Sequence, residues 1–308
     1  MRKKIKEHES FISSINYGYS IINKENFDEL DKQGYTILKT NLNYWKKNNI
    51  DFEKLSEITD KLCKMEGKSG GWENGKSKEK NWEPSAQRIS NLPNKDKVFI
   101  KVSVLPDLIK GVNYVIKNPF KLSSMQIRNP IPFGEKQDMH IDWRPRLFNY
   151  FNFNQCTAFI YLDDANEENG SLNIYPGTHK ILGNPNFELI KEKKLKKVIL
   201  NVKKYNILIL NIFTWHYGGK NLNGKKRRTI FSNYRERSEW QQLNQKKFLD
   251  KNVIDNMNYK LKYLYAVRPE DKNESQWFYK YRNNYLLKGY QKTRDIFYHK
   301  YLNYFNKK

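Results

Sequence analysis

Cysteine is scarce in this 308-residue sequence, and long apolar runs are missing from it. Two cysteines, Cys63 and Cys156, exclude a disulfide framework and a thiolate metal cluster, so we expect a reducing compartment, the cytoplasm. No apolar run approaches the roughly 20 residues that a transmembrane helix needs. The opening MRKKIKEHES lacks the apolar segment of a secretory signal. Hydrophobic residues make up only 38%, but an aromatic content of 15% supplies bulk for a core.

Acidic residues are too few to balance the basic ones. Lys and Arg total 57 against 33 Asp and Glu, which gives a net charge of +24. Such a charge is compatible with nucleic acid or an anionic membrane surface as partner. However, 45 of the basic residues are Lys and only 12 are Arg, whereas proteins dedicated to nucleic acids rely on Arg for bidentate contacts. The 37 Asn that accompany the lysines favour an A/T-rich coding bias, and we do not expect a nucleic-acid partner.

The sequence patterns in the first part of the chain predict mainly helices and loops. A short helix, a break at Gly34 and a strand are predicted within 27–45. Apolar residues at helical spacing predict an amphipathic helix within 46–66. Gly, Ser, Asn, Pro and charged residues without a period predict a loop or flap over 66–98, and a second helix is predicted at about 105–117.

Short β-rich runs separated by turn residues then predict a β core at about 122–236. Such regular short strands are typical of a barrel or a double-sheet jelly roll. Helical spacing returns in 240–308, where the basic and aromatic stretch 275–308 is expected to pack as a helix. Base stacking or contact with an anionic membrane is the alternative for that stretch. We predict one domain, 1–308, with an α+β fold. The candidate strands are SSMQIRNPIP, KQDMHIDW, CTAFIYLDD, SLNIY, KKVILNV, YNILILNIF and RRTIFSNYR.

Two of the five histidines lie in this β region in a pattern that suggests metal binding. His140 and Asp142 are two residues apart on a candidate strand, so their side chains point to the same face. His216 follows an apolar strand 76 residues later. Two His and one carboxylate form the facial triad of non-haem Fe(II) oxygenases, which leaves three positions open on the metal. The His-x-Asp pattern alone favours a core histidine beside an exposed acid, and only the residues that follow His216 favour the metal site.

An arginine pair follows His216 at the start of the last strand. An Arg that reaches into a barrel suits the bidentate binding of a carboxylate. Because neighbouring strand residues face opposite ways, only one of Arg227 and Arg228 can point inward.

Taken together, these segments resemble the phytanoyl-CoA dioxygenase family of Fe(II)- and 2-oxoglutarate-dependent oxygenases. The resemblance rests on HID at 140–142, DDANEENGSLNIYPGTHK at 163–180 and H-x4-N-x5-R at 216–227. An upstream LDKQGYTIL also resembles the opening segment of the family, and the similarity spans roughly 27–236. It implies a double-stranded β-helix, a barrel of the jelly-roll or cupin type, flanked by N- and C-terminal helices.

The resemblance also implies roles for individual residues. His140, Asp142 and His216 match the iron ligands, and Arg227 matches the arginine that holds the C5 carboxylate of 2-oxoglutarate. Gln137 resembles a polar position near the 2-oxoglutarate pocket. The implied cofactors are Fe(II) and 2-oxoglutarate as cosubstrate. The implied reaction uses O2 to hydroxylate a small-molecule or carrier-linked metabolite, with release of succinate and CO2.

Two other functions remain open from the sequence. One is a nucleic-acid-directed oxygenase with the same metal chemistry, motivated by the charge of +24. The other is a catalytically inactive basic binding protein on the same fold. His179, in the PGTHK segment, is expected to be a structural loop residue, and Cys156 is expected to fill the core. The primary substrate and the oligomeric state do not follow from the sequence.

Overall fold

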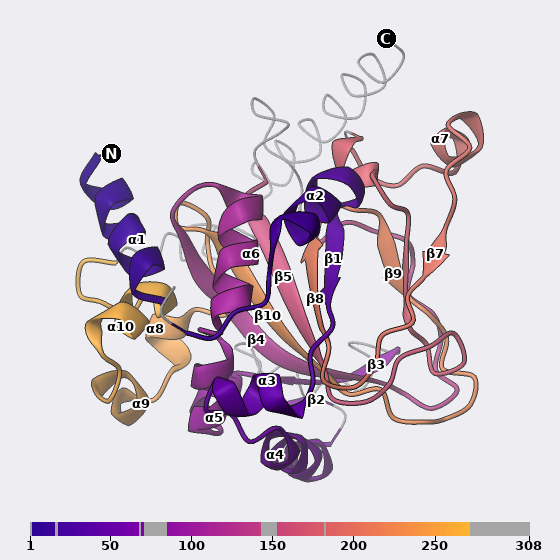
Figure 1. Cartoon of the computed structure of the whole chain (residues 1–308). Coiled ribbons are helices and arrows are strands. Elements are labelled where there is room, and N and C mark those ends of the chain that lie inside the picture. Colours follow the sequence, from indigo (N-terminus) through magenta and orange to yellow (C-terminus); the bar gives the residue numbers. More distant parts are fainter. Residues whose placement is uncertain are drawn as a thin grey trace, which may run out of the picture.

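The computed structural model describes residues 2–15, 18–67, 69–70, 85–142, 153–181 and 183–271 (Figure 1). Helices pack around two largely antiparallel β-sheets, so the expected α+β class with a β core is confirmed. The helix expected in 275–308 lies outside the described residues. None of the described helices is both long and apolar enough to cross a bilayer.

The larger sheet has seven strands in the order β1-β8-β5-β10-β4-β3-β2. Neighbouring strands run antiparallel, apart from the short parallel pair of β2 and β3. Its central strands are fully buried and contain long runs of apolar and small residues, which is typical of strands covered on both faces. The strands are β1 (Tyr35–Leu38), β2 (Ser69–Gly70), β3 (Ala86–Ser90), β4 (Phe120–Pro130), β5 (Gln155–Tyr161), β8 (Ile207–Asn211) and β10 (Thr229–Glu236).

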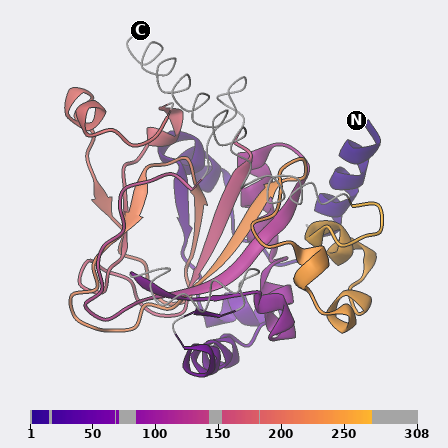
Figure 2. The same cartoon turned by 180° about the vertical axis from the view of Figure 1, so that it is seen from behind.

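The smaller sheet has three antiparallel strands in the order β7-β6-β9. They are β6 (Leu172–Ile174), β7 (Val198–Ile199) and β9 (His216–Gly218), and they lie beside the larger sheet in both views (Figures 1 and 2). Among the described residues, strand pairing does not join the two sheets into a closed barrel. The structure therefore supports the two-sheet arrangement of the expected fold and not a continuous barrel wall.

Helix α6 (Pro106–Ile116) covers the outer face of the larger sheet and packs on β5, β8 and β10 (Figure 1). Pro106 begins this helix, as is common at the first helical position. Gly111 allows a close approach, because a Cβ atom there would lie 2.4 Å from Cδ1 of Ile209 in β8. The result is a core between α6 and one face of the sheet, which leaves the other face for the site.

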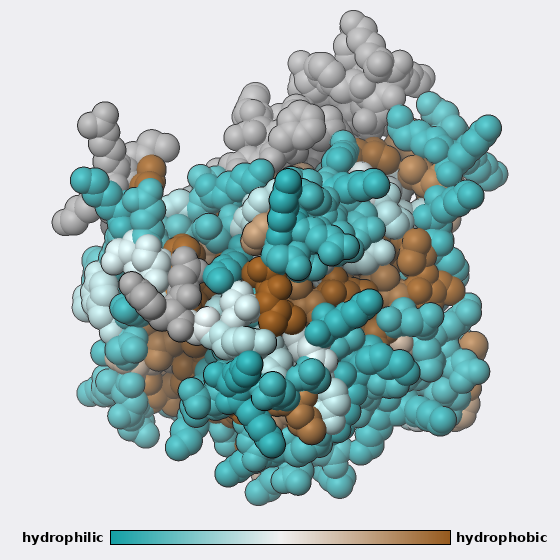
Figure 3. Space-filling model, in the orientation of Figure 1, coloured by the Kyte–Doolittle hydropathy of each residue, from teal (hydrophilic) through white to brown (hydrophobic). Residues whose placement is uncertain are grey.

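The remaining helices surround this core. Helix α2 (Lys24–Gln33) packs on β1, and α1 (Arg2–Ile15) contacts the helices that follow β10 through His8 and Tyr263. Side chains on the face that carries α2, α3 and α6 are mostly hydrophilic, with a smaller hydrophobic area near its centre (Figure 3). The other elements are α3 (Leu42–Lys47), α4 (Phe52–Glu66), α5 (Lys97–Val102), α7 (Phe187–Glu192), α8 (Gln245–Phe248), α9 (Lys251–Asp255), α10 (Tyr259–Tyr265), and the 3-10 turns Leu92–Asn94 and Thr178–Lys180.

Three predicted segments differ from the structure. The single helix expected in 46–66 is two helices, because the chain turns at 48–51 and Asp51 caps a new helix through its side chain. The expected loop over 66–98 contains β3. Its residues have a weak preference for strand, but pairing with β4 stabilises the strand nevertheless. Residues 136–143 were expected as a strand, but the described part of this segment, up to 142, is extended chain with one isolated bridge at His140.

Candidate active site

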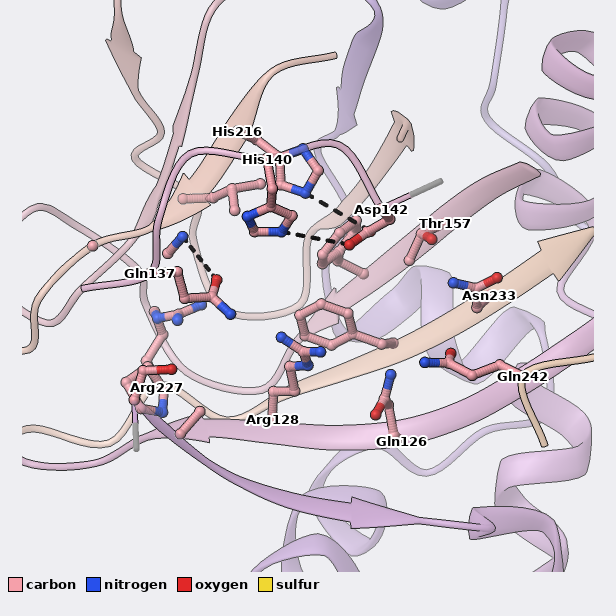
Figure 4. A pocket seen from close by; sticks show the side chains of 18 of the residues that line it. Gln126, Arg128, Gln137, His140, Asp142, Thr157, His216, Arg227, Asn233 and Gln242 are labelled. Carbon is pink, nitrogen blue, oxygen red and sulfur yellow. Dashed lines mark hydrogen bonds and ion pairs between the residues drawn. The ribbon is translucent and has the colours of Figure 1, made fainter. Parts of the chain in front are cut away.

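The two histidines of the predicted triad are brought together by backbone pairing. His140 and His216 form an isolated antiparallel bridge, with N···O distances of 3.0 Å and 3.1 Å in the two directions. His216 begins β9, and the backbone N–H of Asp142 donates to the carbonyl of Ile212 at 3.3 Å. The segment before residue 143 is thus fixed to the segment around His216, although they are far apart in sequence. Asp142 and the two imidazoles consequently face one another (Figure 4).

The donor atoms of the three side chains form a compact group. Nε2 of His140 lies 3.5 Å from one carboxylate oxygen of Asp142, and Nε2 of His216 lies 3.8 Å from the other. One ligand atom from each side chain lies within 4.8 Å of the others, so the group could hold a metal ion. Two imidazoles and one carboxylate are a suitable donor set for Fe(II).

Carbonyl groups fix the orientation of both imidazoles. Nδ1 of His140 lies 2.7 Å from the carbonyl of Asp138, and Nδ1 of His216 lies 2.7 Å from the carbonyl of Thr214. A carbonyl only accepts, so Nδ1 carries the proton in each ring, and the lone pair of Nε2 points toward Asp142. This is the arrangement that metal-binding histidines commonly have.

Burial and the carboxylate shift the protonation equilibria in opposite directions. Burial lowers the pKa of His216 to about 4, which keeps its imidazole neutral at neutral pH. Burial would also lower the pKa of His140, but the hydrogen bond and charge of Asp142 outweigh it and raise the value. Burial opposes the charge on Asp142, yet the two histidines and Arg128 hold the pKa of this carboxyl well below its usual range. The carboxylate is therefore ionised and available as a ligand.

The side chains of Arg227 and Arg228 point to opposite sides of the sheet, as strand geometry requires. Arg227 lines the same cavity as the three side chains, whereas Arg228 points away from it. Nε and Nη2 of Arg228 donate to Asp163 at 2.9 Å and 2.7 Å, and Nη1 donates to the carbonyl of Ser56. Arg228 is thus a structural tie between α4 and the end of β5. Its pKa is raised by Asp163, although burial opposes the charge.

Arg227 has a different environment. It is 8% exposed, its Nε atom has no hydrogen-bond partner, and no carboxylate pairs with it in the described part of the chain. Burial and the nearby charge of Arg128 lower the pKa of its guanidinium. A buried cation without a counter-ion is costly, so this position suits an anionic ligand.

Asn221 explains the spacing between His216 and Arg227. Its Oδ1 accepts from the N–H of Gly224, and its Nδ2 donates to the carbonyl of Lys225 at 2.9 Å. Gly224 has a positive φ of 70°, a conformation that favours glycine. The side chain of Asn221 therefore closes the turn that returns the chain to β10 with Arg227 facing the cavity.

Gln137 lies at the same end of the cavity as Arg227 (Figure 4). Its Oε1 accepts from the N–H of Gly218 at 3.0 Å, and its backbone N–H donates to the carbonyl of Gly218. A Cβ atom on Gly218 would lie 2.8 Å from Oε1 of Gln137, so a larger residue here would displace the Gln137 amide. The predicted polar residue is thus held against the strand that carries His216.

His179 and Cys156 lie outside this group, as expected. His179 is buried in the turn Thr178–Lys180, where its Nε2 lies 3.3 Å from the carbonyl of Asp31. Burial lowers the pKa of His179 to about 4. Cys156 is buried in the core beneath α6, and burial raises the pKa of its thiol.

Sequence reasoning missed most of the cavity wall. In β5, Cys156, Ala158 and Ile160 belong to the core, whereas the odd-numbered residues line the cavity. The same alternation places Gln126 and Arg128 of β4 in the cavity wall. The available signal was the alternation of polar and apolar residues within these strands. The missed residues are Gln155, Thr157, Phe159 and Tyr161 of β5 and Arg235 of β10.

Two solved structures share this fold. EctD from S. alaskensis with bound Fe has a TM-score of 0.55 at 13% identity, covering 74% of this chain and 83% of that chain. The epimerase SnoN, in complex with Fe3+, alpha ketoglutarate and nogalamycin RO, has a TM-score of 0.51 at 15% identity, covering 69% and 83%. At such identities the likeness shows the shared fold alone.

The sequence itself matches a family profile over most of the β core. No curated protein is significantly similar to the chain. The profile described as Phytanoyl-CoA dioxygenase (PhyH) matches residues 30–229, a range that contains the three clustered side chains and Arg227. The chain therefore belongs to the phytanoyl-CoA dioxygenase family of Fe- and 2-oxoglutarate-dependent oxygenases.

Proposed function

We propose that this protein is an Fe(II)- and 2-oxoglutarate-dependent dioxygenase that hydroxylates a small-molecule or carrier-linked metabolite and releases succinate and CO2. The observation that carries the proposal is one cavity with two kinds of binding group. It combines a three-residue donor set with a buried guanidinium that has no carboxylate partner among the described residues. The donor set suits Fe(II), and the guanidinium suits the distal carboxylate of 2-oxoglutarate.

His140, Asp142 and His216 would hold the metal. The carbonyls of Asp138 and Thr214 accept the Nδ1 protons, so both Nε2 atoms are ready to coordinate without a change of tautomer. When bound, Fe(II) with 2-oxoglutarate and O2 supplies the oxidation that couples decarboxylation to hydroxylation of a C–H bond. These hydrogen bonds hold the two imidazoles in position before the metal binds.

Arg227 and Gln137 would bind 2-oxoglutarate. Both lie at one end of the cavity, while the donor set lies along its side (Figure 4). The Arg227 guanidinium would pair with the distal carboxylate, and the Gln137 amide would contact the same molecule. The side chain of Tyr161 also lines this part of the cavity, and burial raises its pKa to about 12, so its hydroxyl stays protonated and can donate.

Support for a small-molecule substrate comes from two sides. The solved SnoN structure contains nogalamycin RO, and a second EctD structure contains 2-oxoglutarate and 5-hydroxyectoine. The cavity in this chain is enclosed by the inner face of the large sheet and by the segment of His216. We do not favour a nucleic-acid substrate. If DNA or RNA were bound specifically, binding would persist at moderate salt with a strand or sequence preference, which a titration in increasing KCl measures.

Anaerobic addition of Fe(II) and 2-oxoglutarate to the metal-free protein tests the proposal. We expect a visible metal-to-ligand charge-transfer band, its loss in His140→Ala and its weakening in Arg227→Ala. His179→Gln is the matched control, because this histidine lies outside the donor set and should leave the band in place. Absence of the band from folded wild-type protein would contradict the proposal and favour the inactive binding protein.

A further inference from the structure

We infer that the primary substrate is a small polar molecule with several hydroxyl or amide groups, neutral or anionic, and not a fatty acyl chain. This inference rests on the proposed function, since it concerns the part of the same cavity that 2-oxoglutarate would leave free. It is carried by the side chains at the end of the cavity opposite Arg227.

The cavity has two ends with different chemistry. Arg227 and Gln137 lie at one end, and Thr157, Asn233 and Gln242 lie at the other (Figure 4). The donor set of His140, Asp142 and His216 lies between them along one side. If 2-oxoglutarate extends from Arg227 toward the donor set, the substrate must occupy the opposite end. We call this end the amide pocket and define it by Gln126, Gln155, Thr157, Asn233 and Gln242.

Strand register brings the residues of the amide pocket together. Asn233 in β10 is paired with Thr157 in β5 on one side and with Ser124 in β4 on the other. The hydroxyl of Ser124 donates to Oε1 of Gln242 at 2.7 Å, which holds the Gln242 amide beside these paired residues. Asn233, Thr157 and Ser124 belong to paired strands, so this part of the pocket is formed before a substrate binds.

Phe159 and Phe231 form the adjacent row of the wall. They are register partners, and their rings meet edge to face with centroids 4.4 Å apart. Gln126 in β4 pairs with Phe231 from the other side. This aromatic pair lies between Asn233 and the end with Arg227, and it offers a flat face to a ring or a carbon skeleton.

Four polar atoms of the amide pocket have no hydrogen-bond partner among the described residues. Oε1 of Gln126, Nε2 of Gln155, Oγ1 of Thr157 and Oδ1 of Asn233 are buried and accept or donate no hydrogen bond within the described part of the chain. Their residues are between 1% and 6% exposed. Buried polar groups are normally hydrogen-bonded, and several together at one place point to a missing ligand. Each amide offers both a donor and an acceptor, so the ligand must supply both kinds of group.

An acyl chain would not satisfy this wall. Each buried polar group left without a hydrogen bond weakens binding by roughly 5- to 150-fold. Four such atoms therefore discriminate strongly against hydrocarbon and in favour of hydroxyl, amide or similar groups. A strongly cationic ligand is also disfavoured, because Asp142 is the single carboxylate among the described lining residues, while Arg128, Arg227 and Arg235 all line the cavity.

Saturation-transfer NMR on the full chain loaded with Zn(II) and 2-oxoglutarate tests the inference. The probes are methyl β-D-glucopyranoside and xylitol as polar molecules, and 1-octanol as an apolar one. We expect a signal from at least one polar probe, a weaker one from 1-octanol, and a polar signal reduced at least about 5-fold in Asn233→Leu or Gln126→Leu. Asn184→Leu, on the exposed surface, is the matched control and should keep the signal.

Three results would overturn the inference: a stronger signal from 1-octanol than from the polar probes, no polar signal at millimolar concentration, or a polar signal unchanged in both pocket variants. The Fe(II)–2-oxoglutarate band is recorded for the same proteins. A band with the wrong probe preference contradicts only the inference, whereas absence of the band from folded wild-type protein contradicts the proposed function. Two separate variants keep the test valid if one of them fails to fold.

Discussion

Arg227 and Arg228 are adjacent in sequence but should respond to the same substitution in opposite ways. Arg227 faces the cavity without a carboxylate partner among the described residues, whereas Arg228 is bound to Asp163 and to the carbonyl of Ser56. Replacing each by Met removes the charge while keeping much of the apolar volume. We expect Arg227→Met to weaken 2-oxoglutarate binding and Arg228→Met to destabilise the fold.

The magnitudes follow from the contacts. Loss of a charge-assisted, bidentate pair in a buried site costs about 2–4 kcal/mol, so the Kd of 2-oxoglutarate should rise by about 30- to 1000-fold in Arg227→Met. The same variant should be as stable as the wild type or more so without ligand, because a buried unpaired cation is removed. Arg228→Met leaves Asp163 without its partner and should lower the free energy of unfolding by about 1–3 kcal/mol.

Two measurements separate these effects. Anaerobic titration of the Fe(II) protein with 2-oxoglutarate, followed by the charge-transfer band, gives the Kd. Urea denaturation of the metal-free protein gives the free energy of unfolding. The reasoning is refuted if Arg228→Met raises the Kd by more than about threefold while Arg227→Met leaves it unchanged. A threefold change in Kd corresponds to about 0.6 kcal/mol of binding free energy.

Two further predictions concern residues outside the cavity. Burial lowers the pKa of His8 to about 4 from 6.5, so its contribution to stability is complete above pH 6.5 and is lost as the pH falls toward 4. The free energy of unfolding should therefore fall by about 2 kcal/mol more between pH 7 and pH 5 in the wild type than in His8→Gln, as measured by denaturation at both pH values; equal slopes would contradict this. Gly34 has a φ of 84°, and a Cβ atom there would lie 2.3 Å from Oγ1 of Thr214. The carbonyl of Thr214 orients His216, so Gly34→Ala should lower the free energy of unfolding by about 2 kcal/mol and weaken Fe(II) binding. An unchanged melting temperature together with a normal Fe(II) affinity would contradict this prediction, because it would mean that Thr214 can move aside without disturbing His216.

The elements that the sequence predicted well are those with a strong local signal. Gly34 ends α2 in a left-handed conformation, and Pro106 begins α6, so both boundaries are close to those expected. β3 was missed because its residues, Ala86–Ser90, carry little strand preference and depend on pairing with β4. Such pairing joins segments far apart in the chain, and no local pattern contains it.

The site was predictable to a similar degree. The side chains of His140, Asp142 and His216 meet as the spacing suggested, although the first two lie on extended chain and not on a strand. Strand alternation required one of Arg227 and Arg228 to face inward, and the structure places Arg227 there. The amide pocket was not predicted, because it depends on the register of three strands, which a single sequence does not display.

The same strands serve stability and binding on opposite faces. In β5, the even-numbered residues pack under α6 in a core of fully buried apolar side chains, while the odd-numbered residues present polar atoms to the cavity. Those atoms and Nε of Arg227 are buried without a hydrogen-bond partner among the described residues, which lowers the stability of the fold, and the apolar core on the opposite face offsets this cost. A ligand that forms hydrogen bonds with these buried polar atoms and pairs with Arg227 would gain binding free energy from them. Binding of 2-oxoglutarate should thus raise the melting temperature of the metal-loaded protein, and a polar substrate should raise it further.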